Sequence, residues 1–165
     1  MKKLILVCGP AGIGKSTYTR RYKESHPDEN VFVISADDTR CALCGGYDKF
    51  PPTGNMLIVY DAMIEKAKKL VETEPNLTII MDTTSLTDRR RLHYSNALRK
   101  DFDRLEIKLL RLHDYQLCYK RNSTRAKDRF VPEHVITDMI AHYEDPGEEV
   151  KKVFDDIEEV YMDQD

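Results

Sequence analysis

The stretch Gly9-Pro10-Ala11-Gly12-Ile13-Gly14-Lys15-Ser16 decides the fold of this 165-residue chain. It fits the pattern G-x-x-x-x-G-K-[ST], a loop that binds phosphate groups between a buried strand and a helix. Glycines let backbone N–H groups curl around phosphate oxygens, and the N-terminus of the following helix adds partial positive charge. Lys15 can reach the β- and γ-phosphates of a nucleotide, and the Ser16 hydroxyl can ligate Mg²⁺. We therefore expect a strand before this loop and a helix from Thr17 to Ser25 after it.

Short runs rich in Ile, Val and Leu alternate with helical patterns along the whole chain. Such runs are typical of strands buried on both faces, and repeated strand–helix units predict a parallel sheet between two layers of helices. We expect an α/β three-layer sandwich with four to five strands, folded as a single domain over residues 1–165. The clearest strands are predicted at Lys3–Cys8, Val31–Ser35, Leu77–Asp82 and Leu105–Leu112.

Helices are expected between these strands and after the last of them. Apolar residues at helical spacing predict a helix over Met56–Val71, and Thr87 suits the N-cap of the next helix. Asp114 and Pro132 suit the starts of two more helices. The last helix is predicted over about Glu148–Val160.

Composition limits the partners of the chain. With a net charge of −3 and no apolar run of membrane-spanning length, we expect a soluble, cytoplasmic protein without a membrane partner. Because the overall charge repels phosphate backbones, a nucleic-acid ligand requires a local basic groove. Cys41-x-x-Cys44 could form half of a zinc site or a redox pair, but no second pair or nearby His completes a ligand set, which favours reduced thiols.

Two polar clusters follow predicted strands, Asp37-Asp38-Thr39-Arg40 and Asp82-Thr83-Thr84. Ligands of parallel sheets bind at the carboxyl ends of strands. A carboxylate there can accept a proton from an attacking hydroxyl or hold a metal, and Arg40 could bind a substrate phosphate. Because Asp is also a frequent helix cap, we expect one of Asp37 and Asp38 to cap and the other to take part in chemistry. Asp82 could instead form an Asx-turn at its strand end.

A basic block covers Lys120–Arg129 and stands out in an acidic chain. It could be a solvated helix face, or a lid whose arginines neutralise a transferring phosphoryl group. No N-K-x-D motif follows, which disfavours a GTPase. The phosphate loop, the strand-end acids and the basic block together favour a small kinase.

With these blocks in order, the chain resembles the 5′-kinase domain of polynucleotide kinases, especially the phage type, a group of P-loop kinases. The block K-R-N-S-x-R placed before V-P is the most discriminating. Ala36 and Thr39 differ from the larger residues usual at their positions, which leaves the shape of the substrate pocket open. The chain lacks a D-x-D-x-[TV] motif, so 3′-phosphatase activity is not expected. The matching blocks are Gly9–Thr17, Ser35–Arg40, Ile80–Leu86 with Arg89-Arg90 beyond, and Lys120–Arg125 running to Val131-Pro132.

The resemblance implies transfer of the γ-phosphate of ATP, with Mg²⁺, to the 5′-hydroxyl of DNA or RNA. It makes Asp37 the general base, although the residues alone do not choose between Asp37 and Asp38. Arg40 would hold the phosphate next to the attacked nucleoside, with Asp82 and Thr83 beside it. Lys15 and Arg125, the main arginine of a lid over about residues 121–131, would act in catalysis, and Ser16 would bind the metal. The implied ATP-binding residues are Gly9, Ala11, Gly12, Ile13, Gly14, Lys15, Ser16, Thr17, Arg121 and Arg125.

Two other functions fit the same residues. A small-molecule kinase of this fold, acting on a nucleoside, a sugar or, like the zeta toxins, a nucleotide sugar, would suit the acidic net charge. A basic rim beside Asp37, from Arg89, Arg90 and Arg91, would favour nucleic acid instead. A nucleotide-dependent regulatory protein is the third reading, but a sensor has little need of the Asp37 and Arg40 pair. A role in nucleic-acid repair rests on analogy, and the oligomeric state stays open.

Overall fold

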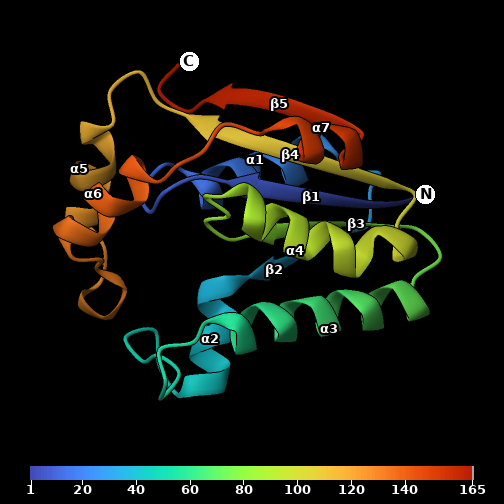
Figure 1. The fold of residues 1–165 in the computed structure, drawn as a ribbon, viewed down its shortest axis with the longest axis horizontal. Helices are drawn as coiled ribbons and strands as arrows, with labels where there is room; N and C mark the ends of the chain where they lie inside the picture. Colours follow the sequence, from blue (N-terminus) through green and yellow to red (C-terminus); the bar gives the residue numbers. More distant parts are fainter. Residues whose placement is uncertain (165) are drawn as a thin grey trace.

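The computed structural model describes residues 1–164 and places a five-stranded parallel sheet at the centre of the chain (Figure 1). The strand order is β2-β3-β1-β4-β5, and every neighbouring pair is parallel. The predicted parallel α/β fold is therefore confirmed. After β1 the chain forms β2 and β3 on one side of β1, and then β4 and β5 on its other side. Ligands of such sheets bind at the carboxyl end of the strand where the direction changes, which here is β1. The strands are β1 (Lys2–Cys8), β2 (Val31–Ser35), β3 (Leu77–Asp82), β4 (Arg104–Arg111) and β5 (Asp156–Tyr161).

Helices pack on both faces of this sheet. On one face lie α3, α4 and α7, and on the other lie α1, α5 and α6, with α5 and α6 beyond the strand ends (Figure 1). Among residues 1–164, no helix is both long and apolar enough to cross a membrane. The helices are α1 (Lys15–Ser25), α2 (Ala36–Cys44), α3 (Leu57–Thr73), α4 (Asp88–Leu98), α5 (Gln116–Ser123), α6 (Glu133–Ala141) and α7 (Glu148–Val153), with 3₁₀ turns at Arg99–Asp101 and Lys127–Arg129.

Strand β1 explains why its sequence is apolar without alternation. Leu4 and Leu6 pack into the core beneath α3 and α4, whereas Ile5 and Val7 pack beneath α1, α5 and α6. Successive side chains of a strand point to opposite faces, so a strand covered on both sides buries every residue. Each of these side chains contributes about 1.5–3 kcal/mol by leaving water.

The predicted last helix over Glu148–Val160 is wrong. Helix α7 ends at Val153, and β5 then pairs with β4 at one edge of the sheet. Val150 is buried in the core, whereas in β5 Ile157 and Val160 are only partly buried, on opposite faces, and Glu158 is exposed. In an edge strand rich in charged residues, apolar and polar side chains alternate only weakly. The few apolar residues of this segment are also spaced as in a helix, which led to the wrong prediction.

The helix starts confirm one predicted cap and correct another. Thr87 caps α4, since its Oγ1 accepts a hydrogen bond from the backbone N–H of Arg90 at 3.3 Å. The expectation that Asp37 or Asp38 caps α2 is wrong, because the Ser35 hydroxyl accepts from the N–H of Asp38 at 3.2 Å. Both carboxylates lie in the first turn of α2, where the helix dipole favours negative charge. They remain free for other contacts.

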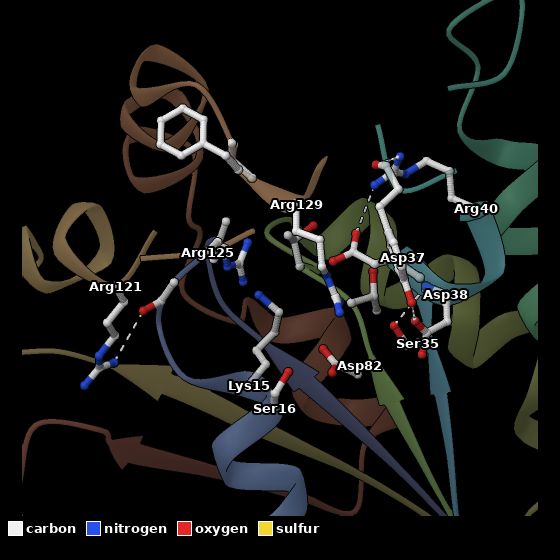
Figure 2. Close-up of a pocket in the computed structure, with 18 of the residues that line it drawn as sticks. Lys15, Ser16, Ser35, Asp37, Asp38, Arg40, Asp82, Arg121, Arg125 and Arg129 are labelled. Carbon is white, nitrogen blue, oxygen red and sulfur yellow. Dashed lines mark hydrogen bonds and ion pairs between the residues drawn. The ribbon is translucent and has the colours of Figure 1, made fainter. Parts of the chain in front are cut away.

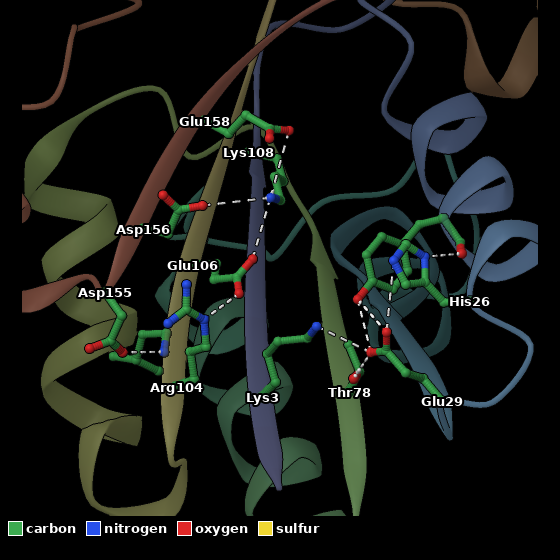
Figure 3. A network of polar contacts seen from close by, with 12 residues as sticks. Lys3, His26, Glu29, Thr78, Arg104, Glu106, Lys108, Asp155, Asp156 and Glu158 are labelled. Carbon is green, nitrogen blue, oxygen red and sulfur yellow. Dashed lines mark hydrogen bonds and ion pairs between the residues drawn. The ribbon is translucent and has the colours of Figure 1, made fainter.

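Charged side chains form a network on the α1 face of the sheet, near the strand starts (Figure 3). Glu106 and Lys108 are each only 8% exposed, and their charged atoms lie 3.3 Å apart. Arg104 donates to Glu106 at 2.6 Å, and Lys3 lies 3.2 Å from Glu29. Burial raises the pKa of Glu106, but the contacts with Arg104 and Lys108 outweigh it and bring the pKa below its ordinary value.

Candidate active site

A cavity of about 1260 Å³ lies at the carboxyl ends of the strands (Figure 2). Its walls are the phosphate loop, the start of α2, the loop after α2, the end of β3 and residues 121–132. The cavity therefore joins the predicted phosphate loop, the two polar clusters and the basic block. Basic side chains outnumber acidic ones in its lining, although the whole chain carries a net charge of −3. This excess of positive charge suits an anionic ligand.

The phosphate loop requires glycine for steric reasons. Gly12 has φ +83°, and a Cβ there would lie 2.5 Å from the carbonyl oxygen of Cys118 in α5. The N–H of Gly9 donates to the carbonyl of Thr84 at 2.8 Å, which fixes the start of the loop against the segment after β3. Lys15 folds back over its own loop and donates to the carbonyls of Gly9 and Pro10 at 3.0 and 3.1 Å. The loop thus holds the Lys15 ammonium inside the cavity.

Lys15 and Asp82 face each other across this part of the cavity (Figure 2). Burial lowers the pKa of Lys15, and the charges of Asp82 and Asp37 oppose that shift. Burial likewise raises the pKa of Asp82, and the charge of Lys15 opposes that shift. Desolvation therefore dominates at both groups. A bound polyphosphate would add negative charge beside Lys15 and favour its ammonium form.

The residues near Ser16 suit a magnesium ion that is carried in with phosphates. Among residues 1–164, no group of three or more His, Cys, Asp or Glu side chains is placed to hold a metal ion. Mg²⁺ usually takes one or two protein oxygens and completes its shell with water and substrate phosphates. The hydroxyl of Ser16 and the carboxylate of Asp82 lie near each other in the cavity, and these are oxygen donors of the required kind (Figure 2).

Arg40 is more constrained than its predicted phosphate-binding role requires. Its Nη1 donates to the carbonyls of Tyr47 and Lys49, both at 2.6 Å, and its guanidinium lies 4.3 Å from the centre of the Phe50 ring. Its Nη2 lies 3.3 Å from Oδ1 of Asp37. Arg40 is 7% exposed, and it holds the loop after α2 as well as the carboxylate beside it.

The arginines of the basic block take different positions. Arg121 donates to the carbonyls of Ile13 at 2.9 Å and Gly12 at 3.3 Å, and also to Met162 at 3.3 Å. It therefore braces the phosphate loop against the end of β5. Arg125 is exposed and lies next to Lys15 in the cavity, where it remains available to a phosphate (Figure 2).

One contact between the two sides of the cavity is not predicted by the sequence. The guanidinium of Arg129 lies over the Tyr47 ring at 4.2 Å, and the Tyr47 hydroxyl donates to Oδ1 of Asp38 at 2.7 Å. Arg129 belongs to the basic block and Tyr47 to the long loop after α2, but nothing in the sequence pairs them. The contact links residues 121–131 to the loop after α2.

The basic rim considered for Arg89, Arg90 and Arg91 does not form, since none of the three lines the cavity. Arg91 is fully buried and donates to the carbonyls of Ser85, Leu86 and Glu144. It holds the segment after β3, in which Thr83 is 3% exposed and lines the cavity. The basic residues of the cavity come instead from α1, from Arg40 of α2 and from residues 121–129.

A family model described as an AAA domain matches residues 4–146. The chain belongs to this AAA domain family. A search of curated proteins finds no match to this chain.

Several solved structures resemble this chain over most of its length. A gluconokinase from Sinorhizobium meliloti 1021 is similar with a TM-score of 0.65 and 16% identity, covering 99% of this chain and 84% of that chain. A structure of the Pnkp1/Rnl/Hen1 RNA repair complex is similar with a TM-score of 0.70 and 20% identity, and the match covers 93% of this chain and 46% of that chain. A fungal RNA kinase has a TM-score of 0.67 and 13% identity, and the match covers 99% of this chain and 76% of that chain. At these identities the likeness shows the fold, which is that of P-loop kinases.

Proposed function

We propose that this protein is an ATP-dependent polynucleotide 5′-hydroxyl kinase, which transfers the γ-phosphate of ATP to the 5′ end of DNA or RNA. One observation carries the proposal. A single cavity with an excess of basic side chains contains both the phosphate loop and the paired Asp37 and Arg40. A phosphate-binding loop alone serves many functions, but an exposed carboxylate facing it suits a hydroxyl acceptor.

The donor nucleotide would bind on the phosphate loop. Backbone N–H groups of the loop between Ala11 and Ser16, the Lys15 ammonium and the exposed Arg125 would surround its phosphates, with Thr17 beside them. Arg121 would keep the loop in shape through its contacts with Gly12 and Ile13. Ser16, with Asp82 nearby, would hold Mg²⁺, which neutralises charge on the phosphates when bound.

The acceptor hydroxyl would lie against Asp37. Its oxygen forms a bond to the γ-phosphorus as the bond from that phosphorus to the β–γ bridging oxygen breaks, and ADP leaves. Asp37 accepts the hydroxyl proton, a step that contributes about 10²–10⁴-fold to the rate. The Asp37 side chain is 52% exposed, so an incoming hydroxyl can reach it.

The remaining residues would hold the acceptor and exclude water. Arg40 and Thr83, with Asp82 nearby, would order the acceptor side of the cavity. Residues 121–131 would act as a lid, which the Arg129–Tyr47 contact would close onto the loop after α2. We place all these parts in one domain over residues 1–165 and expect the protein in the cytoplasm, with nucleic-acid repair as the process it serves.

A small-molecule kinase is the second candidate. The net charge of −3 favours it, and the similar gluconokinase has the same fold. Its acceptor would occupy the same cavity and lose its proton to the same carboxylate.

A phosphate-transfer assay tests both candidates. The protein is incubated with γ-labelled ATP and Mg²⁺, and with 5′-hydroxyl DNA and RNA oligonucleotides, nucleosides and sugars as acceptors. We expect label at the oligonucleotide 5′ end that is lost in the Asp37→Asn variant. Label on a nucleoside or a sugar alone would replace this proposal with the second candidate.

A further inference from the structure

We propose that the groove between α1 and β2 binds the phosphodiester backbone of a single-stranded polynucleotide, downstream of the nucleotide whose 5′-hydroxyl is phosphorylated. This inference rests on the proposed function and names the part of the site that selects a polymer. By this groove we mean the part of the cavity that Arg20 and Lys23 of α1 line together with Val33 and Ser35 of β2.

The geometry of α1 places these two cations together. Residues three apart on a helix are neighbours on one face, so Arg20 and Lys23 point into the same groove. Lys23 lies about 10 Å along the helix axis from Ser16, at a rise of about 1.5 Å per residue. The groove therefore leads about 10 Å away from the phosphate loop.

The two cations are available to a ligand. Both side chains are exposed, and within residues 1–164 neither makes an ion pair or a side-chain hydrogen bond. The groove surface contributed by Thr19, Val33 and Ser35 is uncharged. In a chain with a net charge of −3, unpaired cations along an uncharged surface make a local site for phosphates.

The groove also begins at the acceptor side of the cavity. Ser35 ends β2, and Asp37 stands in the first turn of the following helix α2. An acceptor with its 5′-hydroxyl at Asp37 can continue into the groove, whereas a nucleoside or sugar ends before Lys23. The groove thus distinguishes a polymer from a small molecule.

The same helix provides a matched control. Arg21 is also exposed, but it lines a separate cavity of about 320 Å³ with Tyr18, Tyr22 and Tyr161, toward β5. Replacing Arg21 removes one positive charge from the same helix, half of what the double substitution of Arg20 and Lys23 removes, without changing the groove. Any effect of charge on the whole protein would appear in Arg21→Ala as well.

The test compares acceptors of increasing length. Steady-state KM is measured for a nucleoside 3′-phosphate, a dinucleotide, a tetranucleotide and a 12-mer, as single-stranded DNA and as RNA, at several salt concentrations. We expect the KM of the unmodified protein to fall with length. In the doubly substituted Arg20→Ala/Lys23→Ala protein, the KM of the 12-mer should rise about fivefold, in keeping with exposed contacts. The slope of log KM against log salt should fall by about 1.4, because each of the two lost phosphate contacts lowers it by about 0.7. Arg21→Ala should change neither quantity.

Each contrary outcome has its own meaning. If the 12-mer is phosphorylated but its KM and salt dependence are the same in the doubly substituted protein, the groove is not the binding site, and the proposed function stands. An equal effect from Arg21→Ala also overturns the groove, because it shows a general effect of charge. If no 5′-hydroxyl is phosphorylated, the proposed function fails, and direct binding of a fluorescent 12-mer decides the groove. Binding that Arg20→Ala/Lys23→Ala weakens would keep it as a nucleic-acid site, and absence of binding would remove it.

Discussion

The Nη2 atom of Arg40 lies 3.3 Å from Oδ1 of Asp37, while Nη1 of the same guanidinium donates to the carbonyls of Tyr47 and Lys49. One nearly buried side chain therefore connects the proposed general base to the loop that forms one wall of the cavity. Because the guanidinium is planar and its donors are fixed, it orients the carboxylate and the loop together.

Replacing Asp37 with Asn should reduce kcat by about 10²–10⁴-fold and leave the KM for ATP within about twofold, because only proton removal is lost. Steady-state kinetics with a 5′-hydroxyl acceptor measure both constants. Asp38→Asn should reduce kcat far less, since the Asp38 carboxylate accepts a hydrogen bond from the Tyr47 hydroxyl at 2.7 Å. A larger loss in Asp38→Asn would exchange the roles of the two residues.

Arg40→Lys should lower the free energy of unfolding by about 2 kcal/mol, because an ammonium cannot reproduce the fork that holds two carbonyls. The acceptor KM should rise, and limited proteolysis should become faster between residues 45 and 55. Urea unfolding and timed protease digestion measure these changes. A variant with normal stability and normal digestion would show that the loop after α2 holds its shape without Arg40.

Replacing Asp82 with Asn should stabilise the protein at neutral pH while reducing phosphate transfer. Burial holds the pKa of Asp82 above its ordinary value of 3.8, so the folded state disfavours the ionised carboxylate. This unfavourable contribution grows as pH rises from the ordinary pKa through the raised one, and it persists above. Unfolding in urea from pH 4 to pH 8 should show a gain in the variant that shrinks toward pH 4. A loss of stability at pH 7 would mean that the contact with Lys15 outweighs burial.

Glu106 should show the opposite dependence on pH. Its folded-state pKa lies below the ordinary value of 4.5, because the contacts with Arg104 and Lys108 outweigh burial. The stability that this provides is present above the ordinary pKa and is lost as pH falls through the lowered one. Glu106→Gln should therefore be less stable than the unmodified protein at pH 7, with the two converging at low pH. Parallel acid-unfolding curves with equal midpoints would contradict this.

Arg91→Ala should destabilise the fold by about 3–5 kcal/mol, because it removes a fully buried cation and leaves Asp88 and three carbonyls without their donor. At this chain length the expected fall in Tm is about 10 °C. Arg89→Ala is the matched control on the same helix, since Arg89 is exposed and should contribute less than about 0.5 kcal/mol. Equal effects of the two substitutions would refute a special role for Arg91.

The sequence predicts β1 to β4 to within one residue at each end, because each contains Ile, Leu or Val side chains in a short run that is typical of covered strands. It fails at β5, an edge strand where Glu158 and Glu159 interrupt the pattern. At the site, the motifs single out Lys15, Asp37, Asp82 and Arg125, and the fold places all four in one cavity. The contact of Arg40 with the loop after α2, and the direction of Arg20 and Lys23, depend on how distant elements pack. Neither local propensity nor periodicity contains that information.

The two contacts of Arg121 have a consequence for the order in which the protein matures on the ribosome. Arg121 follows Gly12 by 109 residues and precedes Met162 by 41. The phosphate loop is therefore synthesised long before the side chain and the strand end that brace it. A nascent chain that has released β1 to β3 carries the complete motif but only an unsupported loop. Tight nucleotide binding should consequently arise late in translation, once α5 and β5 have emerged.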